Sequence, residues 1–492
     1  MQTRWRLAKN AAANLIRGGT AGLVAIFLPA VLVRHMSQLE YSVWILVLQV
    51  AAYSSYLDFG LQTAVGRYVA IANEKNDPHQ RDSVFSTAFV GLSIASVIAL
   101  TALIVIACTA GMLFPKVPVA LLPSMRAALL IVGSSIALGL PSSAWSGVFI
   151  GIQRNELIAA VIGGSRLASA FALILASIHG ASIVTMAVIV ASVNLASYVL
   201  LYVLVRHFTE VTFRFALVQQ SVARDLFGYC FSLVIWSFST LLVTGLDLLF
   251  VGRFELGALI PYALATSLVN FIAGVQSAIF GAIMPHAAVL HARNDSALLG
   301  KLVISTTRLG VVLLVLTALP LLIYASPLFR IWVGQQYAVE GYRLLIVLMV
   351  ANIIRLAGMP YSVVLVASAQ QKLVILSPLM EGLTNVVASI VLGMRLGAIG
   401  VAAGTLIGGV VGMLGHIVYN MPRTRKEVAF SVRAFLFSAV GLPVLTATPL
   451  IALFIYTYKK SPPTPLAFAV ACGITLLFVT PIFLRTESRK RI

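Results

Sequence analysis

The chain has 492 residues, of which 60% are hydrophobic and only 10% are charged, and its mean hydropathy is +1.00. Almost every stretch of about 20 residues is apolar enough to cross a bilayer, which excludes a water-soluble globular protein. The net charge of +19 is explained by basic loops on anionic lipid. A nucleic-acid partner would need a basic face on a soluble module, and the sequence offers none.

Fourteen apolar segments follow one another along the chain. They cover residues 13–33, 41–66, 84–109, 126–150, 157–178, 182–205, 228–252, 256–284, 302–324, 343–368, 373–394, 397–418, 432–456 and 465–484. Each run is continuous instead of alternating, and backbone groups in lipid must be satisfied within their own segment, so helices are favoured over strands. The sequence predicts an all-α polytopic membrane protein with about 14 transmembrane helices.

The Lys and Arg residues are unevenly distributed over the connecting loops. If the N-terminus is cytoplasmic, 22 of them lie on the inner side, nine on the outer side and three within helices. Because basic loops are retained on the cytoplasmic side of a membrane, this distribution predicts that the N-terminus and the C-terminus are both cytoplasmic.

Two pairs of short segments repeat at nearly the same spacing. F-G-L-Q-T-A-V (59–65) shares its Gly, Gln and Ala positions with A-G-V-Q-S-A-I (273–279), 214 residues later. Similarly, G-A-S-I-V (180–184) matches G-A-I-G-V (397–401), 217 residues later. The pattern favours a six-helix unit that is present twice, and the alternative is a coincidence between small-residue helix seams.

The repeat divides the chain into three predicted parts. Residues 1–206 form an N-terminal six-helix lobe, 207–426 form a C-terminal six-helix lobe, and 427–492 supply two additional transmembrane helices and a basic cytoplasmic tail. Because each lobe has an even number of helices, the two lobes are parallel and related by an axis along the membrane normal. This architecture is typical of transporters that work by alternating access.

Several motifs resemble a known family. They are S-Y-L-D-F-G-L-Q-T-A-V-G-R-Y-V-A (55–70), L-E-Y-S-V-W (39–44), F-I-G-I-Q-R-N (149–155) and R-L-G-A-I-G-V-A-A-G-T (395–405). Together they resemble polysaccharide flippases of the Wzx/PST type, which belong to the multidrug/oligosaccharidyl-lipid/polysaccharide exporter superfamily, over the first twelve predicted helices. The chain departs from the family at Ser37 and Ser42, where Gly is frequent, and in having more than twelve helices.

The resemblance implies a flippase in the bacterial inner membrane. Such a protein moves an undecaprenyl-pyrophosphate-linked oligosaccharide from the cytoplasmic to the outer leaflet, for lipopolysaccharide or exopolysaccharide biosynthesis. The expected partners are this lipid-linked oligosaccharide and membrane lipids, with a polysaccharide polymerase and a chain-length regulator as further candidates. The alternative from the same superfamily is a cation-coupled multidrug antiporter.

Three arginines lie within predicted helices: Arg17, Arg166 and Arg355. A charge in the bilayer core costs at least ~2.5–3.5 kcal/mol, so it usually faces a water-filled cavity or a partner. The planar guanidinium forks of convergent arginines suit a pyrophosphate, and we expect these three residues to bind the headgroup. Alternatively, Arg17 reaches the cytoplasmic surface and Arg355 pairs with an acid.

Acidic and polar residues in three predicted helices are candidates for ion coupling. Glu381 and Asn385 are four residues apart and share one helix face, while Asp247 and Thr405 lie in other helices. Resemblance to lipid II flippases implies that these four residues form a sodium site, although the acid and amide on the eleventh helix are exchanged. Hard oxygen ligands suit a hard cation. Alternatively, an acid takes up a proton or simply pairs with Arg355.

Glycines recur every four residues along the twelfth predicted helix, at Gly400, Gly404, Gly408 and Gly412. This spacing places them on one face, where a neighbouring helix can approach closely. Tight packing is the simpler interpretation, and a sliding seam is the alternative.

The sequence contains no P-loop, no HExxH, no GxSxG and no CxxC pair. A polytopic glycosyltransferase or polymerase would need a large external loop, and the predicted external loops do not exceed about 20 residues. The sequence therefore predicts a transporter and no enzyme, with no catalytic residue, no bound metal and no cofactor apart from Na⁺ or H⁺ as a coupling ion.

Overall fold

The computed structural model describes residues 20, 22–368, 370–457 and 463–488, and every regular element in these ranges is a helix. Ten helices are long and apolar enough to cross a membrane, or eleven if the bent pair Ala434–Thr446 and Thr448–Thr457 forms one span. Two shorter apolar helices cover Gly22–His35 and Pro465–Thr480. The all-α membrane fold is confirmed, while the predicted number of fourteen spans is not reached by this count and stays a prediction.

The chain forms two compact units. The N-terminal unit contains Met1–Leu241 and Leu248–Ile260, and the C-terminal unit contains Leu242–Asp247 and Pro261–Ile492. The three-part division predicted at residues 206 and 426 is based on the internal repeat, and it stays a prediction.

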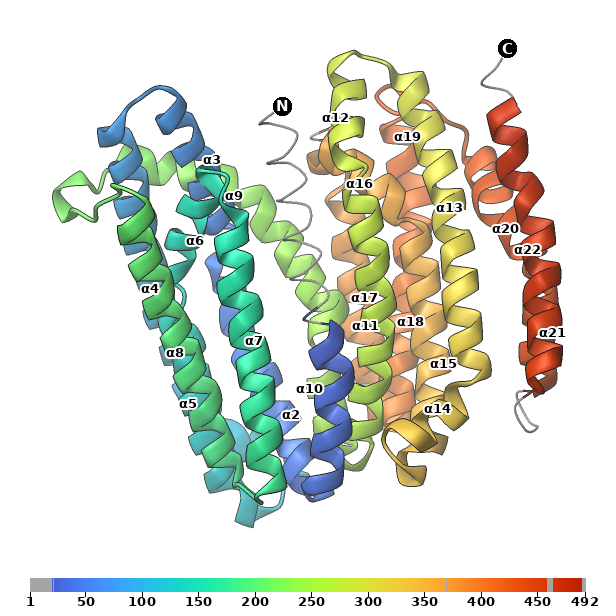
Figure 1. Ribbon diagram of the computed structural model, residues 1–492, viewed down its shortest axis with the longest axis horizontal. Coiled ribbons are helices and arrows are strands. Elements are labelled where there is room, and N and C mark those ends of the chain that lie inside the picture. Colours follow the sequence, from blue (N-terminus) through green and yellow to red (C-terminus); the bar gives the residue numbers. More distant parts are fainter. Residues whose placement is uncertain (1–19, 21, 369, 458–462, 489–492) are drawn as a thin grey trace. The chain divides into compact units, whose positions relative to one another are not determined.

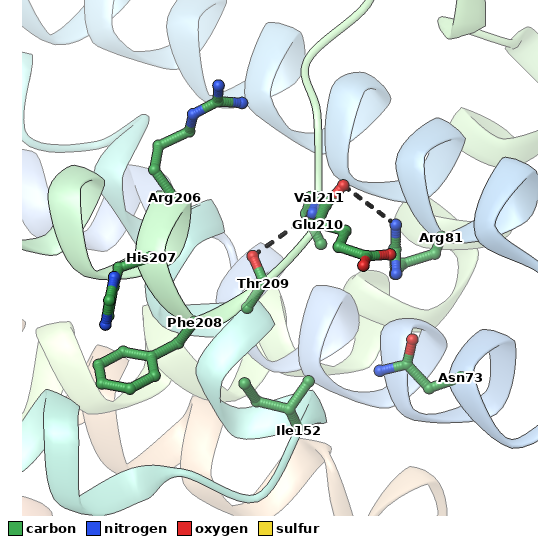
Figure 2. A pocket seen from close by; sticks show the side chains of 9 residues that line it. All are labelled: Asn73, Arg81, Ile152, Arg206, His207, Phe208, Thr209, Glu210 and Val211. Atoms are coloured by element: carbon green, nitrogen blue, oxygen red, sulfur yellow. Dashed lines mark hydrogen bonds between the residues drawn. The ribbon is translucent and has the colours of Figure 1, made fainter.

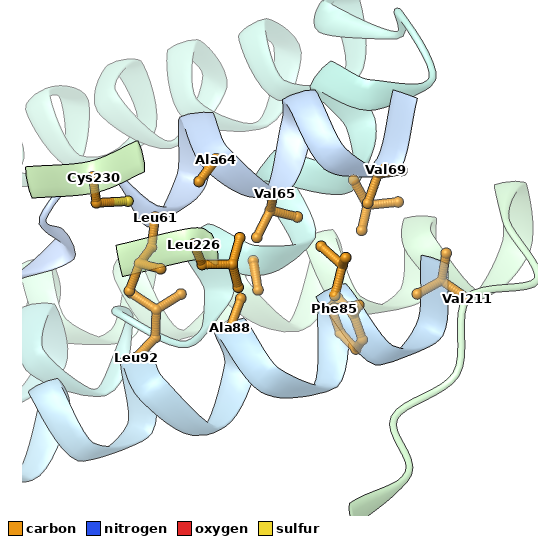
Figure 3. Close-up of a cluster of buried hydrophobic side chains, with 13 residues drawn as sticks. Leu61, Ala64, Val65, Val69, Phe85, Ala88, Leu92, Val211, Leu226 and Cys230 are labelled. Atoms are coloured by element: carbon orange, nitrogen blue, oxygen red, sulfur yellow. The ribbon is translucent and has the colours of Figure 1, made fainter. Parts of the chain in front are cut away.

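The N-terminal unit is built from long helices joined by short turns (Figure 1). They are α2 (Gln38–Ala52), α3 (Leu61–Glu74), α4 (Pro78–Leu113), α5 (Leu122–Leu138), α6 (Ser142–Gly151), α7 (Asn155–Ile178), α8 (Ile183–Phe208) and α9 (Gln220–Thr240). Side-chain caps define the starts of α2 and α4, where Ser37 forms a capping box with Glu40 and Asp77 accepts a hydrogen bond from the backbone of Gln80. Figure 3 shows a core between α3, α4 and α9, lined by Leu61, Val65, Val69, Phe85, Leu92, Leu226 and Cys230.

Two predicted helices of this unit are interrupted. The span predicted over residues 41–66 breaks into α2, a 3₁₀ turn (Tyr53–Asp58) and α3, because Phe59 and Gly60 both adopt the left-handed conformation. The span predicted over 126–150 breaks at 139–141 between α5 and α6, where Pro141 precedes the first residue of α6. Hydropathy averages over both breaks and indicates neither, whereas Pro141 is a residue at which the sequence predicts a kink.

The C-terminal unit contains most of the remaining helices. They are α11 (Leu259–Gly281), α12 (Met284–Ala292), α13 (Ser296–Ile323), α14 (Ala325–Trp332), α15 (Gln335–Ala357), α16 (Met359–Ala367), α17 (Leu376–Leu396), α18 (Ala398–Gly415), α19 (Met421–Arg423), α20 (Leu442–Thr446), α21 (Thr448–Thr457) and α22 (Pro465–Ser488). The division between the units crosses two helices: only Asp247 of α10 (Asp247–Phe254) belongs to the C-terminal unit, and only Leu259 and Ile260 of α11 belong to the N-terminal unit. Three π-helices interrupt this pattern: η4 (Leu241–Gly245), η7 (His416–Asn420) and η8 (Ala434–Gly441).

Helices α17 and α18 lie side by side along their lengths (Figure 1). The tight packing predicted from the glycine spacing is confirmed, since a Cβ atom at any of the four positions would overlap atoms of α17. At Gly404 the overlapping atoms are the hydroxyl and the backbone of Ser389, and at Gly412 they belong to the side chain of Glu381. The two helices therefore approach closely enough for side chains of α17 to contact the backbone of α18.

The helices that follow residue 427 pack against α13 in the same unit. Arg308 of α13 donates from Nε to the Ser438 carbonyl at 3.1 Å and from its terminal nitrogen to the Ser438 hydroxyl at 2.5 Å. Ser438 lies in η8, and π-helices leave carbonyl groups without their usual partners. Arg308 thus adds two side-chain hydrogen bonds to the apolar packing between α13 and the C-terminal helices.

Candidate functional site

Asp247 is the centre of a polar cluster inside the C-terminal unit. It follows η4 at the first position of α10, and it is only 7% exposed. Its Oδ2 accepts hydrogen bonds from the Tyr262 hydroxyl at 3.1 Å and from the Thr405 hydroxyl at 2.9 Å. Its Oδ1 is buried and has no hydrogen-bond partner among the described residues. A buried carboxylate oxygen without a donor is costly, and it offers a ligand position to a cation or a proton.

Asn385 of α17 connects this cluster to the interrupted helix. Its amide nitrogen donates to the carbonyl oxygens of Leu242 at 3.2 Å and Val243 at 2.7 Å, both within η4. Its amide oxygen accepts a hydrogen bond from Ser389 at 3.1 Å. Because a π-helix releases carbonyl groups from the regular ladder, the amide satisfies two of them and holds the segment that precedes Asp247 in place.

Arg355 and Glu381 form an ion pair on α15 and α17, with Nε and Oε1 3.2 Å apart. The pair is close but poorly aligned, since neither of these two atoms has a hydrogen bond of acceptable geometry. The side chain of Arg355 is 25% exposed and that of Glu381 is 10% exposed. Arg355 lies in the last turn of α15, where the helix dipole favours a cation, and the helix ends two residues later.

The charges of these residues do not balance. Asp247 and Glu381 contribute two negative charges and Arg355 contributes one positive charge, so the cluster carries a net charge of −1 when both acids are ionised. Asp247 has no ion-pair partner within the part of the chain that the structure describes. Since a buried charge is stable only when it is compensated, one proton or one monovalent cation would neutralise the cluster. The available ligands are oxygen atoms, which suit a hard cation.

The residues expected to couple an ion are therefore only partly assembled. Thr405 contacts Asp247 directly, and Asn385 faces the same carboxylate. Glu381 pairs with Arg355 instead, as the structural alternative proposed. In the described residues, no group of three His, Cys, Asp or Glu side chains is placed to hold a metal ion.

The three predicted substrate arginines are not brought together within one unit. Arg17 lies outside the described residues. Arg166 lies in α7 of the N-terminal unit with an exposed side chain, whereas Arg355 belongs to the C-terminal unit. Neither unit therefore shows a cluster of these arginines among its described residues.

Sequence reasoning missed Tyr262 and Ser389, which supply a hydroxyl to Asp247 and to Asn385 respectively. Each is a single polar residue in an apolar run, and such residues are common in packed membrane helices. The one available signal was the spacing of four between Asn385 and Ser389, which places both on the face that carries Glu381.

A separate pocket of about 500 Å³ lies at one end of the N-terminal unit. Figure 2 shows Arg81 and Arg206 in its lining, with Arg81 donating to the Glu210 carbonyl at 3.2 Å. Arg81 also pairs with Asp82 at 3.2 Å, and the Glu210 carboxylate lines the pocket. The lining contains two arginines and one acid, and Arg81 is already paired with Asp82, which lies outside the lining.

The sequence matches the model of one known protein family. The family model described as "Polysaccharide biosynthesis protein" matches residues 7–291, more than half of the chain. No curated protein matches the sequence. 

Among solved structures, the chain is similar to the lipid II flippase MurJ in an inward closed conformation, with a TM-score of 0.72 and 14% identity over 98% of this chain and 99% of that one. An inward-facing multidrug resistance MATE family transporter of the MOP superfamily gives a TM-score of 0.67 and 12% identity, over 83% of this chain and 96% of that one. A MOP superfamily transporter from Pyrococcus furiosus gives a TM-score of 0.62 and 11% identity, over 86% of this chain and 96% of that one. At these identities the likeness shows the fold alone.

Proposed function

Because the chain belongs to the polysaccharide biosynthesis protein family, we propose that it is a flippase for a lipid-linked oligosaccharide. Its substrate is an undecaprenyl-pyrophosphate-linked oligosaccharide, which it moves from the cytoplasmic to the outer leaflet of the bacterial inner membrane by alternating access. The observation that carries the proposal is the family match over residues 7–291. The fold shared with a lipid II flippase supports it, since that protein is also a flippase.

The pyrophosphate is bound by arginines within the membrane helices. Arg355 is partly exposed and its ion pair with Glu381 lacks aligned hydrogen bonds, so its guanidinium can turn towards an anionic ligand. Arg166 has an exposed side chain, and Arg17 completes the proposed set. An arginine fork suits a pyrophosphate better than the single ammonium group of a lysine does.

Asp247 couples transport to an ion. Its buried carboxylate, its unpartnered Oδ1 and the net charge of the cluster support uptake of one Na⁺ or one H⁺. Thr405 and Asn385 would hold the ion together with Asp247 in the case of Na⁺, which prefers such oxygen ligands. Binding of a cation would remove the electrostatic cost of the buried charge and favour one conformation of the C-terminal unit.

The chain acts as a transporter and catalyses no covalent reaction. Both termini lie in the cytoplasm, as the distribution of basic residues favours. A polysaccharide polymerase and a chain-length regulator are the proposed protein partners, because the flipped oligosaccharide must next be joined into a longer polymer in the outer leaflet.

A second candidate is a cation-coupled multidrug antiporter. The similarity to MATE family transporters and the buried negative charge of Asp247 favour it, since a cationic drug and a coupling cation can compete for one acid. The partly exposed Arg355 favours an anionic substrate instead.

Mass spectrometry of lipid-linked intermediates tests the proposal. Cells that lack this protein but retain the glycan-assembly enzymes should accumulate one undecaprenyl-linked oligosaccharide and lose the surface polymer. Complementation with the wild-type gene should reverse both effects. An unchanged lipid pool, together with new sensitivity to cationic drugs, would support the antiporter and contradict the flippase.

A further inference from the structure

The geometry of the Arg355–Glu381 pair points to a role for Glu381 that the proposed function does not yet include. We propose that Glu381 is an internal competitor that occupies Arg355 when no substrate is bound, and that the pyrophosphate must displace it. This inference rests on the proposed function, because it requires a substrate with a pyrophosphate group. Glu381 is thus a positioning residue that sets how tightly the headgroup is held.

The pair is close enough for strong attraction but is not locked by hydrogen bonds. Nε of Arg355 and Oε1 of Glu381 are 3.2 Å apart, yet neither atom takes part in a hydrogen bond of acceptable geometry. An aligned, bidentate pair would have to lose two charge-assisted hydrogen bonds before Arg355 could bind another anion. The observed pair loses mainly its charge attraction, so exchange with a second anion is easier.

The two side chains differ in their freedom to move. Glu381 is held at the seam between α17 and α18, where a Cβ atom at Gly412 would overlap its carboxylate. Arg355 has a side chain that is 25% exposed, against 10% for Glu381, and lies in the last turn of α15. The arginine is therefore the partner that can turn away, while the carboxylate stays in place and recaptures it.

The surrounding charges reinforce the competition. Asp247 adds a second negative charge close enough to interact with Arg355. A pyrophosphate that approaches Arg355 meets repulsion from Glu381 as well as attraction from the guanidinium. Removal of the Glu381 charge removes both the competitor and the repulsion, so the headgroup should bind more tightly.

Weakened binding has a function in a transport cycle. A substrate that is held too tightly leaves the protein slowly. Release of the product is the step that limits the turnover rate of many enzymes. A carboxylate that reclaims Arg355 as the headgroup departs would speed release without changing the specificity of the guanidinium for phosphate groups.

The test measures the affinity of purified full-length protein for farnesyl pyrophosphate, a short soluble isoprenyl pyrophosphate, with farnesol as the uncharged control. We expect Glu381→Gln to bind the probe about tenfold more tightly than wild type, which corresponds to ~1.4 kcal/mol. Glu381→Met, which keeps the side-chain length without charge, should do the same if the Gln variant does not fold. Glu156→Gln removes the acid of a partly exposed ion pair in the N-terminal unit, and it should leave the affinity unchanged.

The outcomes separate this inference from the proposed function. If Arg355→Ala weakens probe binding and Glu381→Gln strengthens it, both stand, because damage to the fold does not produce tighter binding. If Arg355→Ala weakens binding but neither variant of Glu381 strengthens it, the competitor role is wrong and pyrophosphate recognition stands. If Arg355→Ala and wild type bind the probe equally, the role of Arg355 in the proposed function fails. Glu381→Gln should also lower the amount of surface polymer in cells, despite its tighter binding.

Discussion

Substitution of Gly404 by Ala should separate α17 from α18 and disturb the polar cluster. A Cβ atom at this position would lie 2.5 Å from the backbone nitrogen and 2.7 Å from the Cα atom of Ser389. The closer distance is about 0.9 Å short of the 3.4 Å at which ordinary contact begins. Backbone atoms cannot rotate away, so the helices must move apart by a comparable distance.

The expected loss of stability follows from two costs and one opposing gain. Overpacking of a close helix contact typically costs ~1–3 kcal/mol. Replacing Gly by Ala within a helix returns about 1 kcal/mol through helix propensity. The neighbouring Thr405 moves with the backbone, and its hydrogen bond to Asp247 lengthens from 2.9 Å, which costs a further ~0.5–1.5 kcal/mol. The net destabilisation should be about 0.5–3.5 kcal/mol.

Thermal unfolding of the detergent-solubilised protein, followed by tryptophan fluorescence, measures this effect. Gly404→Ala should lower the unfolding midpoint, while Gly409→Ala on the same helix should change it little, because its nearest neighbour atom would lie 3.3 Å away at the carbonyl of Ala351. Equal midpoints for Gly404→Ala and wild type would refute the interpretation that the seam has no space for a methyl group.

Three further substitutions test other contacts. Asp247→Asn removes the uncompensated buried charge, so export measured in vesicles should lose its dependence on a Na⁺ or H⁺ gradient; a retained dependence would exclude Asp247 as the coupling acid. Thr405→Val keeps the shape but removes one hydroxyl from the Asp247 carboxylate, and it should weaken apparent affinity for the coupling ion by about fivefold, the equivalent of ~1 kcal/mol. Arg308→Ala removes both hydrogen bonds to Ser438, so trypsin should cleave faster between α19 and η8; an unchanged cleavage rate would show that apolar packing alone holds the C-terminal helices.

The fold was largely predictable because the main signal is local. A continuous apolar run dictates a helix in lipid, whatever the rest of the chain does. The interruption over Tyr53–Asp58 was not predictable in this way, since its short polar stretch lies between long apolar runs that dominate the average hydropathy, and the left-handed backbone at Phe59 has no hydropathy signature. The tight packing along α18 was predictable for the same local reason, because glycines four residues apart are about one helical turn apart and lie on one face.

The candidate site was predictable only in part because its contacts are not local. Asp247 and Thr405 were selected by residue type and resemblance, and their hydrogen bond joins residues that are 158 positions apart in the sequence. No pattern near Tyr262 indicates that its hydroxyl faces an acid. The exchange of acid and amide on α17 is accompanied by a specific arrangement: Asn385 binds the carbonyl groups of η4, and Glu381 binds Arg355.

The position of the two hydroxyls that serve Asp247 has a consequence for how the protein is made. Tyr262 follows Asp247 by 15 residues, whereas Thr405 follows it by 158. At a synthesis rate of ~5–20 residues per second, the first partner leaves the ribosome about 1–3 s after the acid and the second about 8–30 s after it. During this interval Asp247 has one of its two hydroxyl donors. The order in which the helices are synthesised therefore sets the time between insertion of Asp247 and the arrival of its second hydroxyl donor, Thr405.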